Sequence, residues 1–199
     1  FNFRLAFRFG EVNSPSGLRG LASAVSSLLT QGTVKRTSLQ LAEESENIGA
    51  SLHASSSSDN SVLSGSSLTI YRREILDLMA EVLLQPSFPE NELSLYKENT
   101  IKSLEFQRSQ SDFLADEQVS RIIYGDHPYG IASPKPSEIE KLTREDLIAF
   151  HQEHFIPAEA ILFAVGDVDH LSLLSELEEV FSGWTGGEID LDNRITYWK

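Results

Sequence analysis

Apolar and polar residues alternate at the start of the chain. In FNFRLAFRFG, the odd-numbered positions are large and apolar, whereas Asn2, Arg4 and Arg8 are polar. A period of two is typical of a β-strand with one buried face. The pattern predicts a strand in this stretch. Because a protein seldom begins in mid-strand, we also expect this chain to be a fragment, truncated at its first strand, of a longer protein.

Seven segments repeat apolar residues every three or four positions, which is the spacing of an amphipathic helix. Ser38 begins one of them and Thr143 precedes another, and both can cap a first turn. Gly32 suits the end of the first helix, and Pro86 ends the third. The predicted helices cover residues 17–29, 38–49, 71–84, 89–110, 113–123, 144–155 and 171–181.

Two further regions predict strands. Residues 50–70 hold two alternating runs around Asp59-Asn60, which indicates a hairpin, although their many serines are also typical of a flexible linker. Residues 160–168, AILFAVGDV, form a nearly continuous apolar run. Such a run is typical of a strand that is buried on both faces or lies at the centre of a sheet.

The order of these elements predicts an α+β fold, a mainly antiparallel sheet with helices packed on one face. We expect residues 1–187 to form a single domain. The periodic pattern stops after Gly187, so residues 188–199 are expected to begin a linker to a missing second domain.

Composition narrows the classes of function. The chain has 199 residues, with 16 Lys and Arg against 30 Asp and Glu, which gives a formal net charge of −14. Such an acidic surface repels nucleic acid and anionic lipid headgroups. No apolar run approaches the roughly 20 residues that span a bilayer, so we expect a soluble chain. The absence of Cys excludes disulfides, thiolate metal sites and a cysteine nucleophile.

Few motifs in the chain indicate a catalytic or ligand-binding function. Neither phosphate-binding glycine motif occurs, and no G-x-S-x-G elbow supports a serine nucleophile. The best metal candidate is HQEH, because His151 and His154 lie three positions apart and share one face of a predicted helix. Two histidines without an evident third ligand are a weak zinc site. The alternative is that they lie at a helix end, where they interact with its dipole.

The order of several separated segments resembles the pitrilysin and insulinase family of zinc metallopeptidases, from about residue 7 to residue 184. They are GLASAVSSLLTQGT, a helix ending ENIGA, a serine-rich hairpin, QPSFPENEL, YGDHPYG, LTREDLIAFHQEHFIP and AVGDVD. Active members carry an inverted zinc motif, H-x-x-E-H, on the first helix, in which two His bind zinc and the Glu is the general base. A later Glu completes the zinc site.

All three motif positions are serine in this chain. The resemblance aligns the two zinc-binding His with Ser23 and Ser27, and the general base with Ser26. The later ligand falls near Ser103, with Glu105 two residues away and Glu98 on an adjoining turn. Hydroxyls are poor zinc ligands beside imidazole and cannot act as a carboxylate base. We expect no catalytic residue, no metal ligand and no cofactor in this chain.

The resemblance implies a non-catalytic domain. In this family two halves or subunits enclose a chamber, one half often lacks the zinc motif, and a substrate peptide adds as a strand to a sheet edge. We therefore expect a hetero- or homodimer in which a partner bears the zinc and this chain helps to hold peptide. The alternatives are an active peptidase with a metal site rebuilt at His151 and His154, and a non-proteolytic scaffold. Relatives of this organisation are often exported to the bacterial periplasm, which favours that compartment over the cytoplasm.

Overall fold

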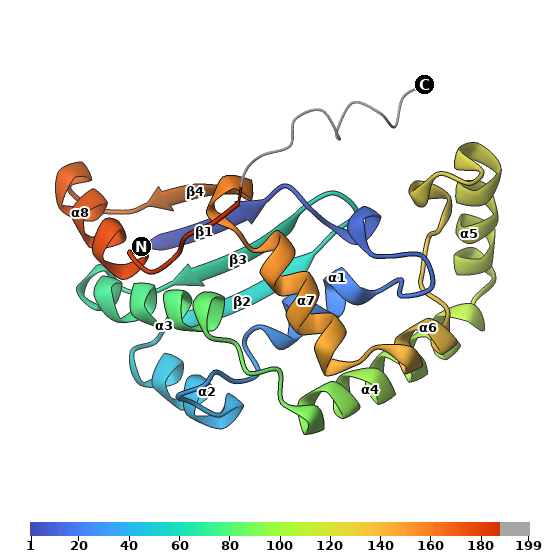
Figure 1. Ribbon diagram of the computed structural model, residues 1–199, viewed down its shortest axis with the longest axis horizontal. Helices are drawn as coiled ribbons and strands as arrows, with labels where there is room; N and C mark the ends of the chain where they lie inside the picture. The colour runs from blue at the N-terminus through green and yellow to red at the C-terminus, as the bar shows by residue number, and fades with distance from the viewer. Residues whose placement is uncertain (188–199) are drawn as a thin grey trace.

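Four strands form one sheet (Figure 1). The computed structural model describes residues 1–187. All neighbouring strands are antiparallel, and their order places β2 and β4 at the two edges. In chain order the strands are β1 (Asn2–Phe7), β2 (Ser51–Ser56), β3 (Ser61–Ser66) and β4 (Ala160–Val165).

The described residues also form helices α1 to α8. All seven predicted helices are present with ends shifted by a few residues, and the short α6 is an addition that the sequence pattern did not predict. The bounds are α1 (Leu21–Leu28), α2 (Ser38–Asn47), α3 (Arg72–Leu84), α4 (Glu90–Arg108), α5 (Ser111–Tyr124), α6 (Pro136–Lys141), α7 (Arg144–His154) and α8 (His170–Val180). Short 3-10 turns occupy Glu11–Asn13, Thr69–Tyr71, Pro128–Gly130 and Pro157–Glu159.

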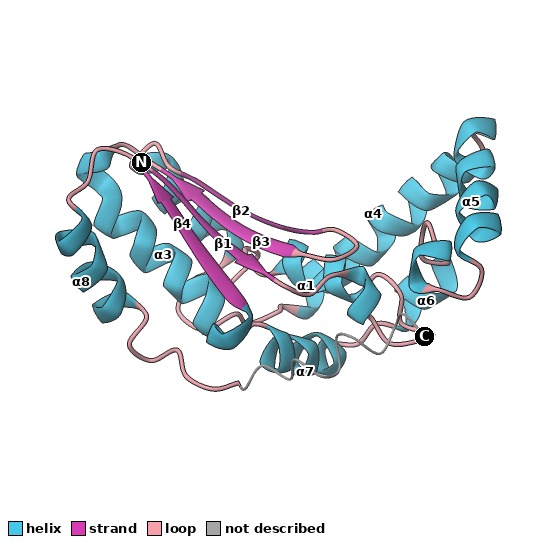
Figure 2. Cartoon of the chain, turned by 90° about the horizontal axis from the view of Figure 1, so that it is seen from above, coloured by secondary structure: helices cyan, strands magenta, loops and turns pink. Residues whose placement is uncertain are grey.

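The core lies between the sheet and the helices on one of its faces (Figure 2). The alternation in β1 has the expected effect, since Phe3, Leu5 and Phe7 are buried while Asn2 and Arg4 are exposed. Helices α1 and α3 pack directly against the strands. The α+β architecture with helices on one face of an antiparallel sheet is therefore confirmed.

A glycine in β3 allows one of these helices to lie close to the sheet. A Cβ at Gly65 would lie 2.5 Å from the sulfur of Met79 and 3.0 Å from a side-chain carbon of Ile75. Both partners are fully buried residues of α3. A larger residue at this position would require the side chains of Met79 and Ile75, or α3 itself, to move.

The predicted helix starts were right for one cap and wrong for another. Thr143 caps α7, where its side chain accepts the Asp146 N–H and the Asp146 side chain bonds back to Thr143. The expected cap Ser38 is instead the first residue of α2. Thr37 is the cap, because its hydroxyl accepts the Gln40 N–H and Gln40 returns a bond to its backbone.

The prediction for the last strand was wrong. β4 is an edge strand, and Ile161, Phe163 and Val165 are exposed rather than buried. The strand ends at Val165, directly before Gly166-Asp167. An apolar composition does not distinguish a central strand from an edge strand, since this depends on which other strands pair with it.

The serine-rich segment is ordered as the predicted hairpin, β2 to β3, rather than as a linker. Residues 188–199, where we expected a linker, lie outside the described residues. Among the helices of residues 1–187, none combines the length and the apolar character needed to cross a membrane.

Candidate functional site

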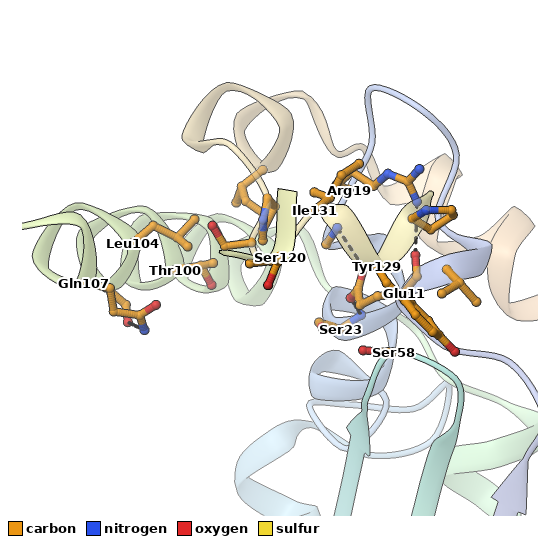
Figure 3. Close-up of a pocket in the computed structure, with 18 of the residues that line it drawn as sticks. Glu11, Arg19, Ser23, Ser58, Thr100, Leu104, Gln107, Ser120, Tyr129 and Ile131 are labelled. Carbon is orange, nitrogen blue, oxygen red and sulfur yellow. Dashed lines mark hydrogen bonds between the residues drawn. The ribbon is translucent and has the colours of Figure 1, made fainter. Parts of the chain in front are cut away.

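A cavity of about 770 Å³ lies where the start of α1 meets α4 (Figure 3). The tip of the β2–β3 hairpin, the end of α5 and the loop that follows α5 complete its wall. Apolar side chains such as Val12, Leu104 and Ile131 share the lining with many hydroxyl and amide groups. The hydroxyl and amide groups come from Ser23, Ser58, Asn99, Thr100, Ser103, Gln107, Ser120 and Ser133, and from the phenols of Tyr96, Tyr124 and Tyr129.

Glu11 in the cavity wall fixes the start of α1. The helix begins after Gly20, which has a positive φ of 92° and offers no side chain to cap the first turn. One carboxylate oxygen of Glu11 accepts the Gly20 N–H at 3.0 Å and the Ser14 hydroxyl at 3.0 Å, and the other accepts the Ser23 N–H at 2.7 Å. The carboxylate thus neutralises the positive end of the helix dipole.

Arg19 is the single Lys or Arg in the cavity lining. Its Nη1 donates to the backbone carbonyls of Glu11, at 3.3 Å, and Ser14, at 2.9 Å. Across the cavity, the Tyr129 hydroxyl donates to Asp59 at 2.5 Å, and this hydrogen bond raises the pKa of Tyr129. Both lining carboxylates, Glu11 and Asp59, therefore already accept hydrogen bonds from the chain itself.

Tyr96 contributes a buried phenol. Burial raises the pKa of Tyr96 to about 12, a shift that a hydrogen bond with Thr100 opposes and the nearby charge of Glu11 reinforces. At neutral pH this phenol stays protonated. It can exchange hydrogen bonds with a ligand but cannot act as a base.

The three aligned serines of α1 have different environments. Ser23 lines the cavity. Ser26 is 1% exposed, and its hydroxyl has no hydrogen-bond partner within residues 1–187. Ser27 is exposed but does not contribute to the cavity lining.

The aligned later ligand, Ser103, also lines the cavity, where its hydroxyl accepts from the Gln107 amide at 3.2 Å. The structure thus brings Ser23 and Ser103 to one cavity from helices 80 positions apart in the sequence. The neighbouring glutamates are not part of it. Glu105 is exposed, and Glu98 is exposed and pairs with Lys102.

Sequence reasoning missed four contributors to the cavity, namely Glu11, Arg19, Tyr96 and Tyr129. The one sequence feature near Glu11 is the glycine-containing stretch that separates it from α1. The spacing of the other three residues along the chain does not indicate a shared cavity. Within the segment YGDHPYG, the Tyr129 N–H donates to Nδ1 of His127. The additional contact of Tyr129 with the hairpin tip was not predictable from the pattern.

His151 and His154 do not line this cavity, and both pack against aromatic rings. Nε2 of His151 lies 2.9 Å from the Leu83 carbonyl, and the ring stacks on Phe155. The ring of His154 stacks on Phe9, with the centroids 5.1 Å apart. Burial lowers the pKa of His151 to about 4 and also lowers that of His154, so both are neutral at pH 7. Both histidines lie in the last turn of α7, as the alternative interpretation expected, and they pack there against aromatic rings.

The donor set limits what the cavity can do chemically. Within residues 1–187, no group of three or more His, Cys, Asp or Glu side chains is arranged to hold a metal ion. Neutral hydroxyls, amides and phenols can bind polar groups by hydrogen bonds. They do not provide a carboxylate or imidazole base.

The sheet edge beside α1 offers a second binding element. Among residues 1–187, β2 has a strand partner only on its β3 side, and α1 packs next to it. The Ser57 N–H donates to the Asn60 carbonyl at 2.7 Å. In an antiparallel ladder every second residue bonds to the neighbouring strand, so the backbone groups of Leu52 and Ser56 point away from β3. An extended peptide can pair with such an edge.

Comparison with known proteins identifies the family. The model of the insulinase family, peptidase family M16, matches residues 2–137. The chain belongs to this family. A second model, the peptidase M16 inactive domain, matches residues 141–197 and extends into residues outside the described part.

Individual relatives agree with the M16 assignment. A chain solved as a peptidase M16 inactive domain from Pseudomonas fluorescens superposes with a TM-score of 0.88 at 26% identity, covering 94% of this chain and 46% of that one. An uncharacterized zinc protease of Rickettsia bellii is 26% identical over 86% of this chain and 42% of its own length. A probable β subunit of the mitochondrial-processing peptidase from Arabidopsis thaliana is 23% identical over 82% of this chain and 31% of its own. The M16 chain therefore spans less than half the length of these relatives.

Proposed function

We propose that this M16 domain is non-catalytic and completes the peptide-binding chamber of a zinc-bearing partner, either a second subunit or another domain. The observation that carries the proposal is the state of α1. This helix forms part of the cavity wall, as a zinc-bearing helix would, yet serine occupies each position aligned with H-x-x-E-H: Ser23, Ser26 and Ser27.

The environments of these serines support the proposal that α1 neither binds zinc nor supplies a general base. Ser26, aligned with the general base, is buried and neutral, so it cannot take a proton from water at neutral pH. Ser23 and Ser103 retain their places at the cavity but supply only hydroxyls. Zinc prefers imidazole, thiolate or carboxylate ligands, and this pair provides none of them.

Peptide binding by this domain rests on the arrangement of the β2 edge and the cavity. A peptide strand paired with β2 would run toward the hairpin tip, where Ser58 and Asp59 form part of the cavity wall. Backbone hydrogen bonds would then supply affinity, and the hydroxyl-rich cavity would receive a side chain. The chain can thus hold a peptide without cutting it.

The role of a partner follows from family membership. M16 proteins often pair with another M16 subunit or domain. In such an assembly zinc, its water and the general base belong to the partner, and the present domain supplies surface for the substrate.

A reconstitution assay tests the proposal. The chain is mixed with an H-x-x-E-H-bearing M16 subunit from the same source, and hydrolysis of fluorogenic peptides is followed. We expect no hydrolysis by the chain alone and at least about a tenfold increase when it joins the partner, because two surfaces then orient the peptide.

A proline at an outward-facing position of β2 provides the matched variant. Ser56→Pro removes one outward N–H and should reduce the stimulation, whereas Ser56→Ala keeps that N–H and should preserve it. Hydrolysis by the isolated chain that is abolished by a chelator would contradict the proposal. So would a zinc-bearing partner whose activity and peptide affinity are unchanged by this chain.

A further inference from the structure

A second pocket, of about 540 Å³, adjoins the cavity at the start of α1. The two share Arg19 and residues 131–133 as a common wall. The end of α4, one face of α5, the loop that follows α5 and the start of α6 complete the pocket. Its charged lining residues are Arg19, Arg108, Arg121, Lys135, Glu117, Asp126 and Glu138. A peptide that occupies the cavity can therefore extend into this pocket.

The charge balance of this pocket is opposite to that of the whole chain. Four cationic side chains line it against three carboxylates, whereas the chain has 16 Lys and Arg against 30 Asp and Glu. At physiological ionic strength, exposed charges more than about 8 Å apart are largely screened from each other. The cations of the lining therefore determine how an anion is received in the pocket, despite the negative charge of the chain.

Two of the three lining carboxylates are already engaged by the chain itself. Oε1 of Glu117 accepts a hydrogen bond from Nη2 of Arg108 at 3.3 Å and another from the Ser133 hydroxyl. Oε2 of Glu138 accepts the Lys135 N–H at 2.9 Å, at the start of α6. Arg108 and Glu117 thus compensate each other as an ion pair.

Three cations of the lining keep unused capacity for an anion. Arg121 and Lys135 are exposed and form no ion pair within residues 1–187. Arg19 is half-buried, and only its Nη1 donates, to two backbone carbonyls. Its Nη2 and Nε make no hydrogen bond in the described part of the chain. The third carboxylate, Asp126, is exposed and opposes these three cations alone.

We infer that this pocket binds a carboxylate of the peptide that the adjoining cavity holds. The inference rests on the proposed function and adds a class of substrate, namely peptides with a carboxylate at the end that enters the cavity. Guanidinium groups bind carboxylates through charge-assisted hydrogen bonds, and an ammonium adds a compact positive charge. Because Arg19 belongs to the shared wall, it can contact the peptide at the point where the peptide passes from cavity to pocket.

Two kinds of carboxylate can reach the pocket, and the direction of the peptide distinguishes them. β2 runs toward the hairpin tip, where Ser58 and Asp59 line the cavity. A peptide antiparallel to β2 brings its N-terminal end to that tip, so its carboxylate is an Asp or Glu side chain. A parallel peptide brings its C-terminal end, which carries the terminal carboxylate.

Four peptides test the inference with the full chain. Each is an acetylated heptapeptide of alternating Thr and Val with an uncharged dye on a central side chain. The first pair ends in a carboxylate or an amide, and the second pair is amidated and begins with Glu or Gln. Fluorescence anisotropy should show at least about fivefold tighter binding of one carboxylate peptide than of its neutral counterpart, and that pair identifies the source. The difference should decrease in about 0.5 M NaCl.

Variants locate the carboxylate. The double variant Arg121→Gln/Lys135→Gln removes two exposed cations and should reduce the difference to less than about twofold, without changing the affinity for the neutral peptides. The matched control is Lys35→Gln/Lys141→Gln, which removes the same charge at two exposed positions outside the pocket lining. This control should retain the full difference.

Equal affinity for each carboxylate peptide and its neutral counterpart would overturn the inference. So would a difference that survives in Arg121→Gln/Lys135→Gln or is lost in the control variant. If the neutral peptides still bind and Ser56→Pro weakens them, the proposed peptide site stands without the carboxylate pocket. A difference that depends on Arg121 and Lys135 but is accompanied by no effect of Ser56→Pro supports the pocket and contradicts pairing along β2. No binding of any peptide at millimolar concentration contradicts both.

Discussion

At the scale of single residues, the hydroxyl of Ser26 is the most unusual group in the site. It is buried in α1 and makes no hydrogen bond within residues 1–187. Burying an unpaired hydroxyl costs free energy because its hydrogen bonds to water are lost. A carboxylate at this position would act as the general base of an active enzyme. The serine hydroxyl cannot take that role, and without a hydrogen-bond partner it does not stabilise the fold.

Ser26→Ala should therefore raise the free energy of unfolding by about 1 kcal/mol. Urea denaturation monitored by circular dichroism measures the change. The control is Ser27→Ala at the exposed neighbouring position, which should stay within about 0.5 kcal/mol of the original chain. A loss of stability in Ser26→Ala would show that this hydroxyl has a partner.

The stability of the fold should depend on pH through His151. Burial lowers its pKa from 6.5 to about 4 in the folded chain, so the unfolded chain binds the proton more readily between these values. The contribution of His151 to the free energy of unfolding should be fully present above pH 6.5. It should be lost as the pH decreases through 6.5 toward 4, and the loss should amount to roughly 3 kcal/mol. Unfolding free energies measured at pH 7 and pH 4.5 give the difference.

The matched variant for this prediction is His151→Gln, which retains a donor for the Leu83 carbonyl but does not titrate. Its stability should change less between the two pH values than that of the original chain. Equal pH dependence in both proteins would contradict the assignment to His151 and shift attention to His154, whose pKa is also lowered by burial.

At the scale of elements, α1 depends on a residue from outside the helix. Glu11 accepts two backbone N–H groups at its start, those of Gly20 and Ser23, because the glycine cannot cap the helix itself. Removing the carboxylate leaves these donors and the Ser14 hydroxyl without their acceptor. The cavity wall then loses the bonds that fix its position.

Glu11→Ala should lower the free energy of unfolding by about 2 kcal/mol, since hydrogen bonds to a charged group are among the stronger ones. Glu11→Gln keeps an acceptor and should cost less than half of that. Thermal and urea unfolding provide both values. If Glu11→Ala is as stable as the original chain, α1 is held by its apolar face alone.

Local patterns predicted most elements, and long-range contacts explain the failures. The alternation of Phe3, Leu5 and Phe7 predicted β1, and Thr143 predicted the start of α7. The cap by Glu11 was not predictable because it joins residues nine and twelve positions apart through the fold. β4 was misplaced because edge position depends on strand pairing, which its own sequence does not encode.

At the scale of the whole molecule, the two edge strands of the described sheet differ in chemistry. The β2 edge lies next to a polar cavity, and the β4 edge is apolar on both faces. The family resemblance predicted the fold, and it aligned a zinc-binding position with Ser23, a residue that lines the cavity. The cavity lining could not be predicted, since Tyr96, Tyr129 and Arg19 converge from separate segments, and their positions along the chain do not show that they meet.

The measurement that tests the non-catalytic assignment most directly is the zinc content of the purified chain. The chain is incubated with zinc, desalted at neutral pH and analysed by elemental mass spectrometry. As a positive control, the variant S23H/S26E/S27H/S103E restores the aligned ligands and base. We predict less than about a tenth of an equivalent of zinc in the original chain and close to one equivalent in the variant. Close to one equivalent in the original chain, with peptide hydrolysis that a chelator abolishes, would contradict the account.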